Sequence, residues 1–407
     1  MKKKLTIIGI NYYPEDTAIG LYTTQLAEYL SDNNYDITLV TGFPYYPSWK
    51  INKEYQEHKL FLKEEINGIN ILRYKQYTPS TPTFLKRIFH LIDFTFGSLF
   101  NLFKVKKTDV VLCIVPFTST IFLGKVLSKL KRAKLWVHVQ DFEFDAALDS
   151  NLTERNQKDS LFFKILFWIE KRLLKTADVT STISASMLKK LEKKTGNKKN
   201  VLLPNWVDIN KINPSKSKPH NYLKSKAFKI LYSGNIGEKQ DWEFFLQFAK
   251  SMQQNKNVEI TIIGDGSKKV WLEKKLCNFN NVILYPPVSY DQLSDLLCSA
   301  DLHFLFQKVD VIDTVMPSKI LAMMASEKPS LITGNLNSEV ATIINKSKAG
   351  AYFSYSDLNK VKTFVEKLEN DKNLRKEYGT NARNYVSNFF SKEEILKQFK
   401  ETLDNIL

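Results

Sequence analysis

The stretch Ile230-Leu-Tyr-Ser-Gly-Asn-Ile-Gly-Glu-Lys-Gln240 decides the fold, because it joins an apolar strand to a polar glycine turn just before a helix. The apolar run starts at residue 228, and a helical pattern follows over 242–253. A strand without a polar face that alternates with helices is typical of a parallel sheet covered on both sides. Backbone N–H groups at the start of the following helix favour anions, so Gly234, Asn235 and Lys239 are candidate phosphate ligands.

The same alternation of strand and helix recurs along the whole chain. Apolar runs predict strands at 5–10, 37–41, 110–115, 135–139, 179–183, 201–203, 228–233, 258–263, 282–284, 302–306, 330–333 and 350–353. Between the sixth and seventh runs, residues 208–226 are rich in Lys, Ser, Asn and Pro, which indicates a linker. We therefore predict an α/β protein of two doubly wound, Rossmann-like domains facing each other across a cleft. The predicted domains are residues 1–207 and 208–387, with a final helix at about 388–407 packing back onto the first.

Two more loops of the second half follow strands in the same way. One contains Gly264, Asp265 and Gly266 after the run 258–263. The other, Asp313-Thr-Val-Met-Pro-Ser-Lys319, opens a helix at 320–325. Pro317 and Ser318 suit an ordinary helix start, whereas Lys319 adds a positive charge where free N–H groups already favour an anion. Three such loops after strands of one sheet predict a nucleotide-diphosphate site.

The first half contributes weaker candidates. Gly20 follows the first strand, where it serves either close approach of an anion or a simple tight turn, and the turn is favoured. The strand 135–139 runs into Gln140-Asp-Phe-Glu-Phe-Asp145, whose three carboxylates share one side of an extended chain. A metal-binding Asp-x-Asp site of a single-domain nucleotide-sugar enzyme is one interpretation. It leaves the second sheet unexplained, so we expect at least one carboxylate, Asp141 above all, to serve the cleft.

Composition narrows the class of protein. The 407 residues are 43% hydrophobic and 25% charged, which excludes a disordered chain. No segment reaches the roughly 18 uninterrupted apolar residues of a transmembrane helix, and the run 5–10 is too short for a signal peptide. Cys113, Cys277 and Cys298 are too scattered for a metal cluster or a disulfide framework, so we predict buried thiols and a reducing cytoplasm.

The series of motifs, taken in order, resembles the retaining glycosyltransferases of family 4, which have the two-domain GT-B fold. The matching residues are Asn11-Tyr-Tyr-Pro14 with Ile19-Gly20, Pro204-Asn205 with Val207-Asp208, Tyr232-Ser-Gly-Asn-Ile-Gly237, Gly264-Asp-Gly266, Ala300-Asp301 and Pro317-Ser-Lys319. Pro44-Tyr-Tyr-Pro47 and Val139-Gln-Asp-Phe-Glu143 resemble the branch assigned to colanic acid biosynthesis, a fucosyltransferase branch.

The resemblance implies transfer of a sugar from a nucleotide-diphosphate donor to a glycan or polyprenyl-diphosphate-linked acceptor. The expected donor is a GDP-sugar, with GDP-fucose as the first choice. The second domain would hold the nucleotide and the first the acceptor. Lys239, Lys319 and the N–H groups near Ser318 would neutralise the diphosphate, so neither a metal nor another cofactor is expected. Asp141 would orient the acceptor or balance positive charge on the sugar. It is not assigned as a nucleophile.

Some family positions differ in this chain. Thr314 and Ala322 occupy the positions of a common Glu-x7-Glu pair, so the carboxylate that holds the sugar is absent or supplied by Asp313. Gly234-Asn235 stands where many members have Gly-Arg. A GT-B epimerase or phosphorylase would use the same cleft and stays open as an alternative.

The net charge of +16, from 59 basic and 43 acidic residues, favours polyanionic partners. A nucleic-acid-binding protein would explain the charge, but no aromatic platform is interleaved with the basic residues, and we expect no nucleic-acid partner. Residues 84–107 instead combine an apolar helical stripe with basic ends. The stripe is Ile88, Ile92, Phe96, Leu99 and Phe103, widened by Phe89, Phe94 and Phe100.

Such a helix either covers the sheet or lies in a lipid headgroup layer, and the segment 161–169 would reinforce the same surface. We predict the second: peripheral binding to the anionic inner face of the cytoplasmic membrane.

Overall fold

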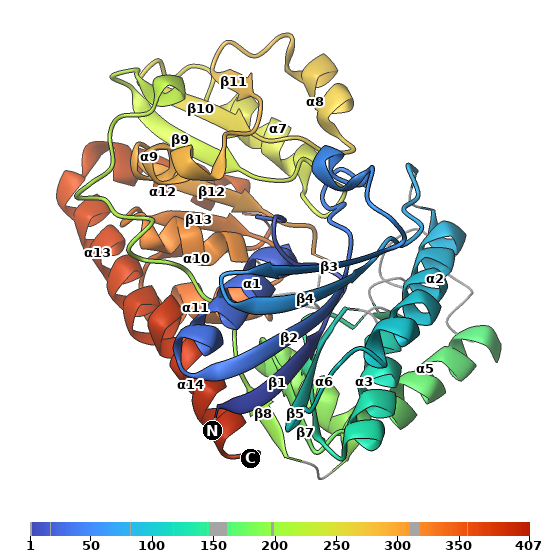
Figure 1. Cartoon of the computed structure of the whole chain (residues 1–407). Coiled ribbons are helices and arrows are strands. Elements are labelled where there is room, and N and C mark those ends of the chain that lie inside the picture. Colours follow the sequence, from blue (N-terminus) through green and yellow to red (C-terminus); the bar gives the residue numbers. More distant parts are fainter. Residues whose placement is uncertain are drawn as a thin grey trace. The chain divides into compact units, whose positions relative to one another are not determined.

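Figure 1 shows the computed structural model, which describes residues 2–16, 18–81, 83–116, 118–142, 144–145, 161–196, 199–309, 318–355 and 357–407. The chain divides into two compact units. Unit 1 comprises Met1–Pro204 together with Leu396–Leu407, and unit 2 comprises Asn205–Ile395. Each unit alternates strands with helices around a sheet of its own.

Unit 1 is built on an eight-stranded sheet with the order β3-β4-β2-β1-β5-β6-β7-β8. Neighbouring strands pair in parallel, except that β3 and β4 form an antiparallel hairpin. Every residue of β5 is buried, because a parallel strand between helical layers has no solvent side. The strands are β1 (Lys3–Ile8), β2 (Tyr35–Gly42), β3 (Phe61–Ile66), β4 (Ile69–Tyr74), β5 (Val110–Val115), β6 (Lys134–Val139), β7 (Val179–Thr182) and β8 (Asn200–Leu202).

Helices cover both faces of this sheet. In Figure 1, α2, α3 and α5 lie together along one side and α1 lies along the other. Their bounds are α1 (Ala18–Asp32), the short 3-10 helix η1 (Lys53–Tyr55), α2 (Phe84–Leu102), α3 (Thr118–Lys131), α5 (Leu161–Leu174) and α6 (Ala185–Thr195). Local chemistry sets the ends of α6: the Ser184 side chain accepts a hydrogen bond from the Met187 N–H, and Gly196 ends the helix at a φ of +77°.

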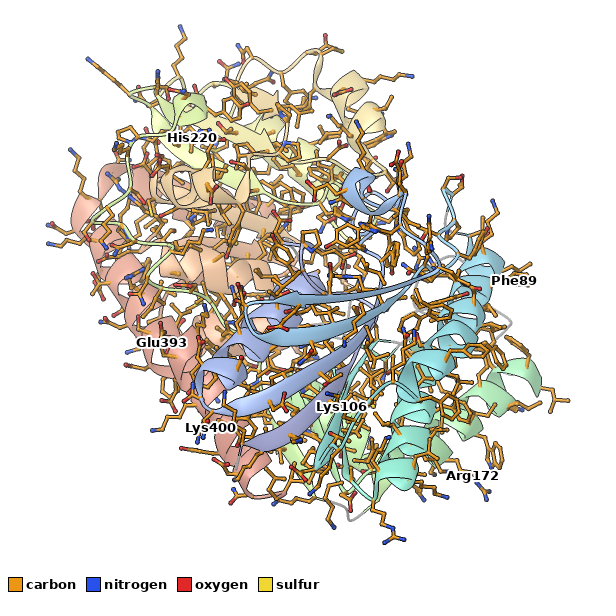
Figure 2. All side chains as sticks on the ribbon, in the orientation of Figure 1. Phe89, Lys106, Arg172, His220, Glu393 and Lys400 are labelled. Atoms are coloured by element: carbon orange, nitrogen blue, oxygen red, sulfur yellow. The ribbon has the colours of Figure 1, made fainter. Side chains whose placement is uncertain are left out.

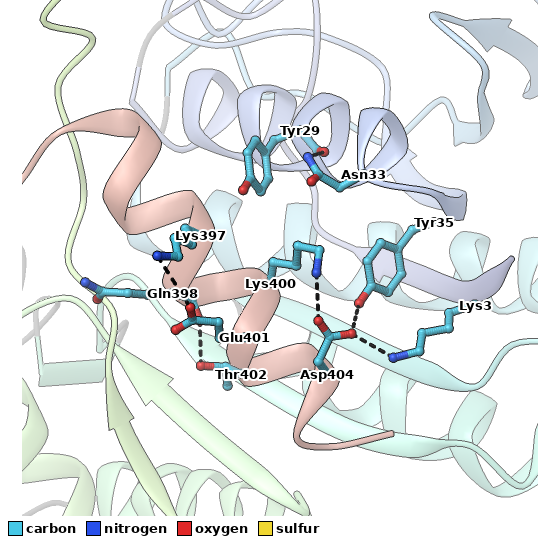
Figure 3. A network of polar contacts seen from close by, with 10 residues as sticks. All are labelled: Lys3, Tyr29, Asn33, Tyr35, Lys397, Gln398, Lys400, Glu401, Thr402 and Asp404. Carbon is cyan, nitrogen blue, oxygen red and sulfur yellow. Dashed lines mark hydrogen bonds and ion pairs between the residues drawn. The ribbon is translucent and has the colours of Figure 1, made fainter.

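The last helix, α14 (Lys392–Asp404), joins the first strands of unit 1 through Asp404. Figure 3 shows the network: Asp404 Oδ1 accepts hydrogen bonds from Lys3 Nζ at 2.7 Å and from the Tyr35 hydroxyl at 2.5 Å. Lys400 Nζ donates to the other carboxylate oxygen at 2.8 Å. The contacts with Lys3, Lys400 and Tyr35 hold the pKa of the Asp404 carboxyl well below its usual range. The carboxylate thus ties the end of the chain to β1 and β2.

Unit 2 contains a six-stranded parallel sheet with the order β11-β10-β9-β12-β13-β14. Its strands are β9 (Phe228–Ser233), β10 (Val258–Ile263), β11 (Val282–Tyr285), β12 (Leu302–Phe306), β13 (Ser330–Thr333) and β14 (Gly350–Phe353). Its helices are η3 (Asn221–Leu223), α7 (Trp242–Ser251), α8 (Lys269–Leu276), η4 (Tyr290–Gln292), α9 (Leu293–Cys298), α10 (Ser318–Ala325), α11 (Glu339–Ser347), α12 (Leu358–Asn370) and α13 (Lys372–Phe389). Aromatic packing joins α7 to β12, with the Phe245 and Phe306 rings stacked at 4.9 Å.

The predicted strands all fall on strands of the structure, and the predicted fold class of two Rossmann-like units is confirmed. The hairpin of β3 and β4 was not predicted. Asn67 and Gly68 join its strands with φ of +51° and +74°, the left-handed geometry that favours an Asn-Gly turn. The prediction of buried thiols holds for Cys113 and is wrong for Cys277, which is exposed.

Among the described residues, none of the helices combines the length and the apolar composition of a transmembrane span.

The Asp404 network predicts a pH-dependent contribution to stability. A carboxyl whose pKa is lower in the folded chain stabilises the fold above its unfolded pKa of about 3.9, and that stabilisation is lost as the pH falls through the folded pKa. Asp404→Asn should lower the free energy of unfolding at pH 7 by up to about 1 kcal/mol, because solvent screens these groups. The deficit should shrink in acid. Urea unfolding of wild type and Asp404→Asn, at pH 7 and in acid, measures this difference in the free energy of unfolding.

Glu401→Gln is the matched control, since Glu401 pairs with Lys397 at 3.9 Å while both side chains are exposed. We expect it to leave stability unchanged at either pH. A deficit of Asp404→Asn that persists in acid would contradict the role given to the Asp404 charge.

Candidate functional site

The strand order of unit 2 reverses beside β9, since β10 lies on one side of it and β12 on the other. Ligands of doubly wound sheets bind beyond the carboxyl ends of the strands at such a switch point. The loops after β9 and β12 meet there: the Lys308 N–H donates to Lys239 O at 3.1 Å, and the Asp241 N–H donates to Phe306 O at 3.3 Å. Unit 2 therefore brings the predicted phosphate loop after β9 beside the start of the segment that follows β12.

The predicted loop after β10 is interlocked with the loop after β9. A Cβ on Gly264 would lie 1.9 Å from Gly234 O, and one on Gly266 would lie 2.4 Å from Asn235 Oδ1. The Ile236 N–H also donates to Asp265 O at 2.8 Å. Glycine is required at both positions because the backbones approach so closely. Asp265 itself is exposed, and its side chain accepts from the Gly266 N–H at 2.8 Å.

Lys319, in the first turn of α10, extends its side chain to the loop after β9. Its Nζ lies 3.2 Å from the Tyr232 hydroxyl and 4.3 Å from the centre of the Tyr232 ring. A Cβ on Gly234 would lie 2.2 Å from that Nζ, so the missing side chain makes room for the ammonium group. Gly234 has a φ of +147°, a backbone conformation that side chains other than glycine rarely adopt.

Lys319 is half-buried, its ammonium is desolvated, and the described residues supply it with no ion pair. Burial lowers the pKa of Lys319 to about 7. An anion beside Nζ would favour the charged amine, so binding of a phosphate group would raise this pKa again. Tyr232 is also buried, which raises its pKa, and its neutral hydroxyl donates to Asn235 O at 2.6 Å. Lys319 is thus poised to receive negative charge.

Further lysines surround the same loops. Lys239 is exposed, and its role as a phosphate ligand stays a prediction. Sequence reasoning missed Lys268 and Lys308, whose Nζ atoms lie 3.1 and 3.9 Å from the Glu238 carboxylate. It also missed Tyr232 as the residue that holds Lys319, although Tyr232 lies in the quoted stretch. The signal was the tyrosine at the end of an apolar strand.

Part of the third predicted loop is not described. Asp313, Pro317 and Thr314 lie outside the described residues. Ser318 begins α10. Ala322 is half-buried on the same helix. The roles predicted for Asp313, Pro317 and Ser318 stay predictions.

In unit 1, the carboxylates after β6 have different environments. Asp141 is half-buried, two residues beyond the end of β6. Asp145 is held by Lys190 at 2.7 Å and Lys194 at 2.8 Å, and these lysines lower the pKa of its carboxyl against the effect of burial. Glu143 lies outside the described residues. Asp145 is therefore a structural ion-pair partner, whereas the catalytic role of Asp141 stays a prediction.

Gly20 lies in the first turn of α1, where it makes room for a buried carboxylate. A Cβ there would lie 2.7 Å from the Glu15 Cβ. Glu15 accepts hydrogen bonds from the Tyr45 and Tyr46 N–H groups, each at 2.8 Å, and from Asn11 at 2.8 Å. Burial raises the pKa of Glu15. Sequence reasoning missed Glu15, which joins the loops after β1 and β2.

These two loops line a pocket of about 440 Å³ in unit 1. Its polar and charged lining includes Asp16, Ser48, Lys50, Asn52, Lys53 and Gln56, beside Tyr45 and Tyr46. The pocket lies beyond the carboxyl ends of β1 and β2, two adjacent parallel strands. Hydroxyl, amide and charged groups beside aromatic rings are suited to a polar organic ligand.

No group of three His, Cys, Asp or Glu side chains suited to a metal ion occurs within the described ranges. Metal independence stays a prediction.

Comparisons with known proteins find a matching family for each of the two units. The family described as glycosyl transferase 4-like domain matches residues 17–206, and the family described as glycosyl transferases group 1 matches residues 215–385. The chain is 31% identical over 410 residues to WcaI of Escherichia coli K12, a glycosyltransferase assigned to colanic acid biosynthesis. That alignment covers 97% of this chain and 98% of WcaI.

Solved structures share the fold at low sequence identity. Sucrose-phosphate synthase from Thermosynechococcus elongatus superposes with a TM-score of 0.72 at 12% identity, covering 100% of this chain and 99% of its own. HepE from Anabaena, solved in complex with UDP, gives a TM-score of 0.70 at 11% identity, covering 99% of this chain and 100% of its own. Another HepE structure contains UDP-glucose.

Lys319→Ala should weaken binding of a nucleoside diphosphate by about 1.5–3 kcal/mol, the usual size of a charge-assisted hydrogen bond. The loss relative to wild type should shrink as the pH rises above about 7, because the wild-type amine is then neutral in the free protein. Calorimetric titration of both proteins at several pH values measures this difference and cancels ionisation of the nucleotide itself. Equal affinities in two folded proteins would remove Lys319 from the site.

Proposed function

Since the chain belongs to the group 1, family 4 glycosyltransferases of the GT-B fold, we propose that it transfers a sugar from a nucleotide-diphosphate donor with retention at the anomeric carbon. The proposed donor is a GDP-sugar, with GDP-fucose as the first choice. The proposed acceptor is a glycan or a polyprenyl-diphosphate-linked glycan of surface polysaccharide biosynthesis. Support for this setting comes from WcaI, which is assigned to colanic acid biosynthesis.

The observation that carries the proposal is the desolvated Lys319 ammonium, held against Tyr232 in the space left by Gly234. A desolvated cation that has no counter-charge among the described residues is costly unless a ligand supplies one. A diphosphate would do so, with Lys239 and the N–H groups at the start of α10 as further partners. Interactions that strengthen as the leaving diphosphate gains charge accelerate the reaction. HepE, which shares this fold, binds UDP and UDP-glucose.

We propose that unit 1 binds the acceptor in the pocket beyond β1 and β2. Its charged and amide side chains offer partners for sugar hydroxyls, and holding one hydroxyl in place lowers the entropic part of the barrier. Asp141 is proposed to orient this hydroxyl or to balance positive charge on the sugar.

The proposal predicts that purified protein releases a nucleoside diphosphate from one nucleotide sugar only when an acceptor is supplied. Thermal shifts with GDP, UDP, ADP and dTDP identify the donor base, because a ligand that binds the native state raises the melting temperature. Transfer is then measured with sugars of that base, and the anomeric configuration of the product is read by NMR. Isomerisation or phosphorolysis without acceptor would contradict a transferase, and inversion would contradict retention.

Lys50→Ala with Lys53→Ala serves as the control for unit 1, because both exposed lysines line the proposed acceptor pocket. This variant should raise KM for the acceptor and leave the nucleotide-induced thermal shift unchanged. Lys319→Ala should do the reverse. The same defect in both variants would reject the division of roles between the units.

Activity should persist in EDTA, because the lysines and helix N–H groups supply the charge that a divalent cation would otherwise bring. The measurement is the transfer rate of metal-stripped protein in the presence of EDTA. Protein that has been treated with EDTA and then dialysed free of it is the control. Complete loss of transfer that Mn²⁺ or Mg²⁺ restores would instead support a metal site at Asp141 and Glu143.

We also propose that the protein acts at the inner face of the cytoplasmic membrane, as the sequence predicted. A separate surface of unit 1 supports this location.

A further inference from the structure

Helix α2 exposes a row of large apolar side chains, while its buried face mixes polar side chains with Phe94 and Leu102. Its exposed side chains recur every three or four residues, on one face of the helix. They are Leu85, Phe89, Ile92, Phe96, Phe100 and, just after the helix, Phe103. Phe96 and Phe100 are each 63% exposed. Large phenylalanines on one continuous exposed face are unusual for a soluble surface.

The opposite face of α2 packs onto the sheet through polar groups. Asp93 accepts hydrogen bonds from the Tyr74 hydroxyl at 3.0 Å and from the Tyr77 N–H at 2.6 Å. A Cβ on Gly97 would lie 2.0 Å from the Tyr74 ring, so the helix lies directly against β4 at this point. Phe94, predicted as part of the stripe, is 0% exposed and belongs to the core. The sheet thus holds the face of α2 that carries Phe94 and Gly97 and leaves Phe89, Phe96 and Phe100 outside.

Helix α5 adds a second apolar face beside the first. Its exposed side chains are Leu161, Phe162, Ile165, Trp168 and Ile169. Helix α3 contacts both α2 and α5, and its exposed Phe122 adds to the same side. Figure 2 shows Phe89 on α2 and Arg172 on α5 along this side of unit 1. We call the exposed apolar residues of the two helices the α2–α5 face.

Basic residues border the α2–α5 face. Residues 84–107 include five basic residues and one acidic residue, Asp93, and residues 161–175 include four basic residues and one acidic residue, Glu170. Both acidic side chains point inward: Asp93 binds Tyr74 and Tyr77, and Glu170 pairs with Lys194. The Arg172 guanidinium lies 5.2 Å above the Trp168 ring. The border is therefore positively charged around an apolar centre.

We propose that the α2–α5 face docks unit 1 onto an anionic lipid surface. Its phenylalanines and Trp168 enter the headgroup region, while the bordering lysines and arginines contact anionic headgroups. A second protein would also cover an apolar face, but a border of one sign fits a uniformly anionic surface better than a copy of itself. The proposal does not depend on the sugar-transfer reaction, since it concerns a different surface of unit 1.

Contacts of α2 connect this face to the pocket of unit 1. The His90 ring lies 4.9 Å from the Tyr45 ring, and the Arg87 guanidinium lies 5.2 Å above the Trp49 ring. Tyr45 lines the pocket, and Trp49 belongs to the same loop. The helix proposed to meet the lipid therefore also supports the loop proposed to meet the acceptor.

Vesicle sedimentation tests the docking. The full chain should sediment with vesicles of phosphatidylglycerol and phosphatidylcholine in equal parts, remain in the supernatant with phosphatidylcholine alone, and dissociate as salt rises. Phe96→Ser with Phe100→Ser should lower the partition coefficient at least about tenfold, because both side chains lose apolar burial. Phe389→Ser, which removes a phenylalanine of unit 2 that is 58% exposed, is the matched control and should bind like wild type.

The charge requirement has its own pair of variants. Lys86→Glu with Lys164→Glu changes one exposed lysine on each helix and should abolish the preference for anionic vesicles. Lys346→Glu with Lys372→Glu makes the same change of net charge on exposed positions of unit 2 and should leave binding intact. If both pairs weaken binding equally, net charge drives it and the proposed face is wrong.

Trp168 gives a readout that is independent of folding defects. It is 57% exposed, whereas the other tryptophans are buried or half-buried. Brominated lipid should quench its fluorescence, and Trp168→Phe should remove the quenched fraction while binding persists. The proposal is wrong if wild-type protein does not bind anionic vesicles at low salt. It is also wrong if the protein shows no vesicle binding and instead forms a dimer that Phe96→Ser with Phe100→Ser dissociates.

Discussion

Parallel pairing of strands that are buried on both faces is the constraint on which both units depend. Such strands must be linked by helices that return across the sheet, so the chain alternates strand and helix throughout. The same rule brings the loops after β9, β10 and β12 to one edge. Close approach of these loops then requires glycine at 264 and 266, and the φ of +147° at Gly234 favours glycine there. The position of the candidate phosphate site therefore follows from the order of the strands, and Lys319 is the main residue added to it.

The buried strands could be predicted from the sequence because an apolar run without a polar face has few other uses. The hairpin of β3 and β4 was missed because Phe61-Leu-Lys-Glu-Glu-Ile66 is half-exposed and mixes charges with apolar residues. The Asn67-Gly68 turn between its strands was the available signal. Only the fully buried runs of parallel strands stand out from the sequence by their lack of polar residues.

The candidate site could be predicted in part. Glycines and Lys319 were visible because they follow strands. Glu15, Lys268 and Lys308 were not, since their importance comes from partners distant in the sequence: Tyr45 and Tyr46 for Glu15, and Glu238 for the two lysines. Periodicity likewise found the stripe on α2 and included Phe94, because spacing alone cannot tell which side of a helix meets the sheet.

The polar contacts beneath α2 have a consequence for how that helix meets any partner. Asp93 is hydrogen-bonded to two groups, and Gly97 lies against the Tyr74 ring, so rotation of the helix about its axis would break specific bonds. Its outward residues are therefore already oriented in the free protein. An amphipathic peptide that folds on a surface loses backbone entropy as it orders, whereas this helix has paid that cost during folding. Binding at the exposed face of α2 therefore does not have to include the entropic cost of ordering this helix.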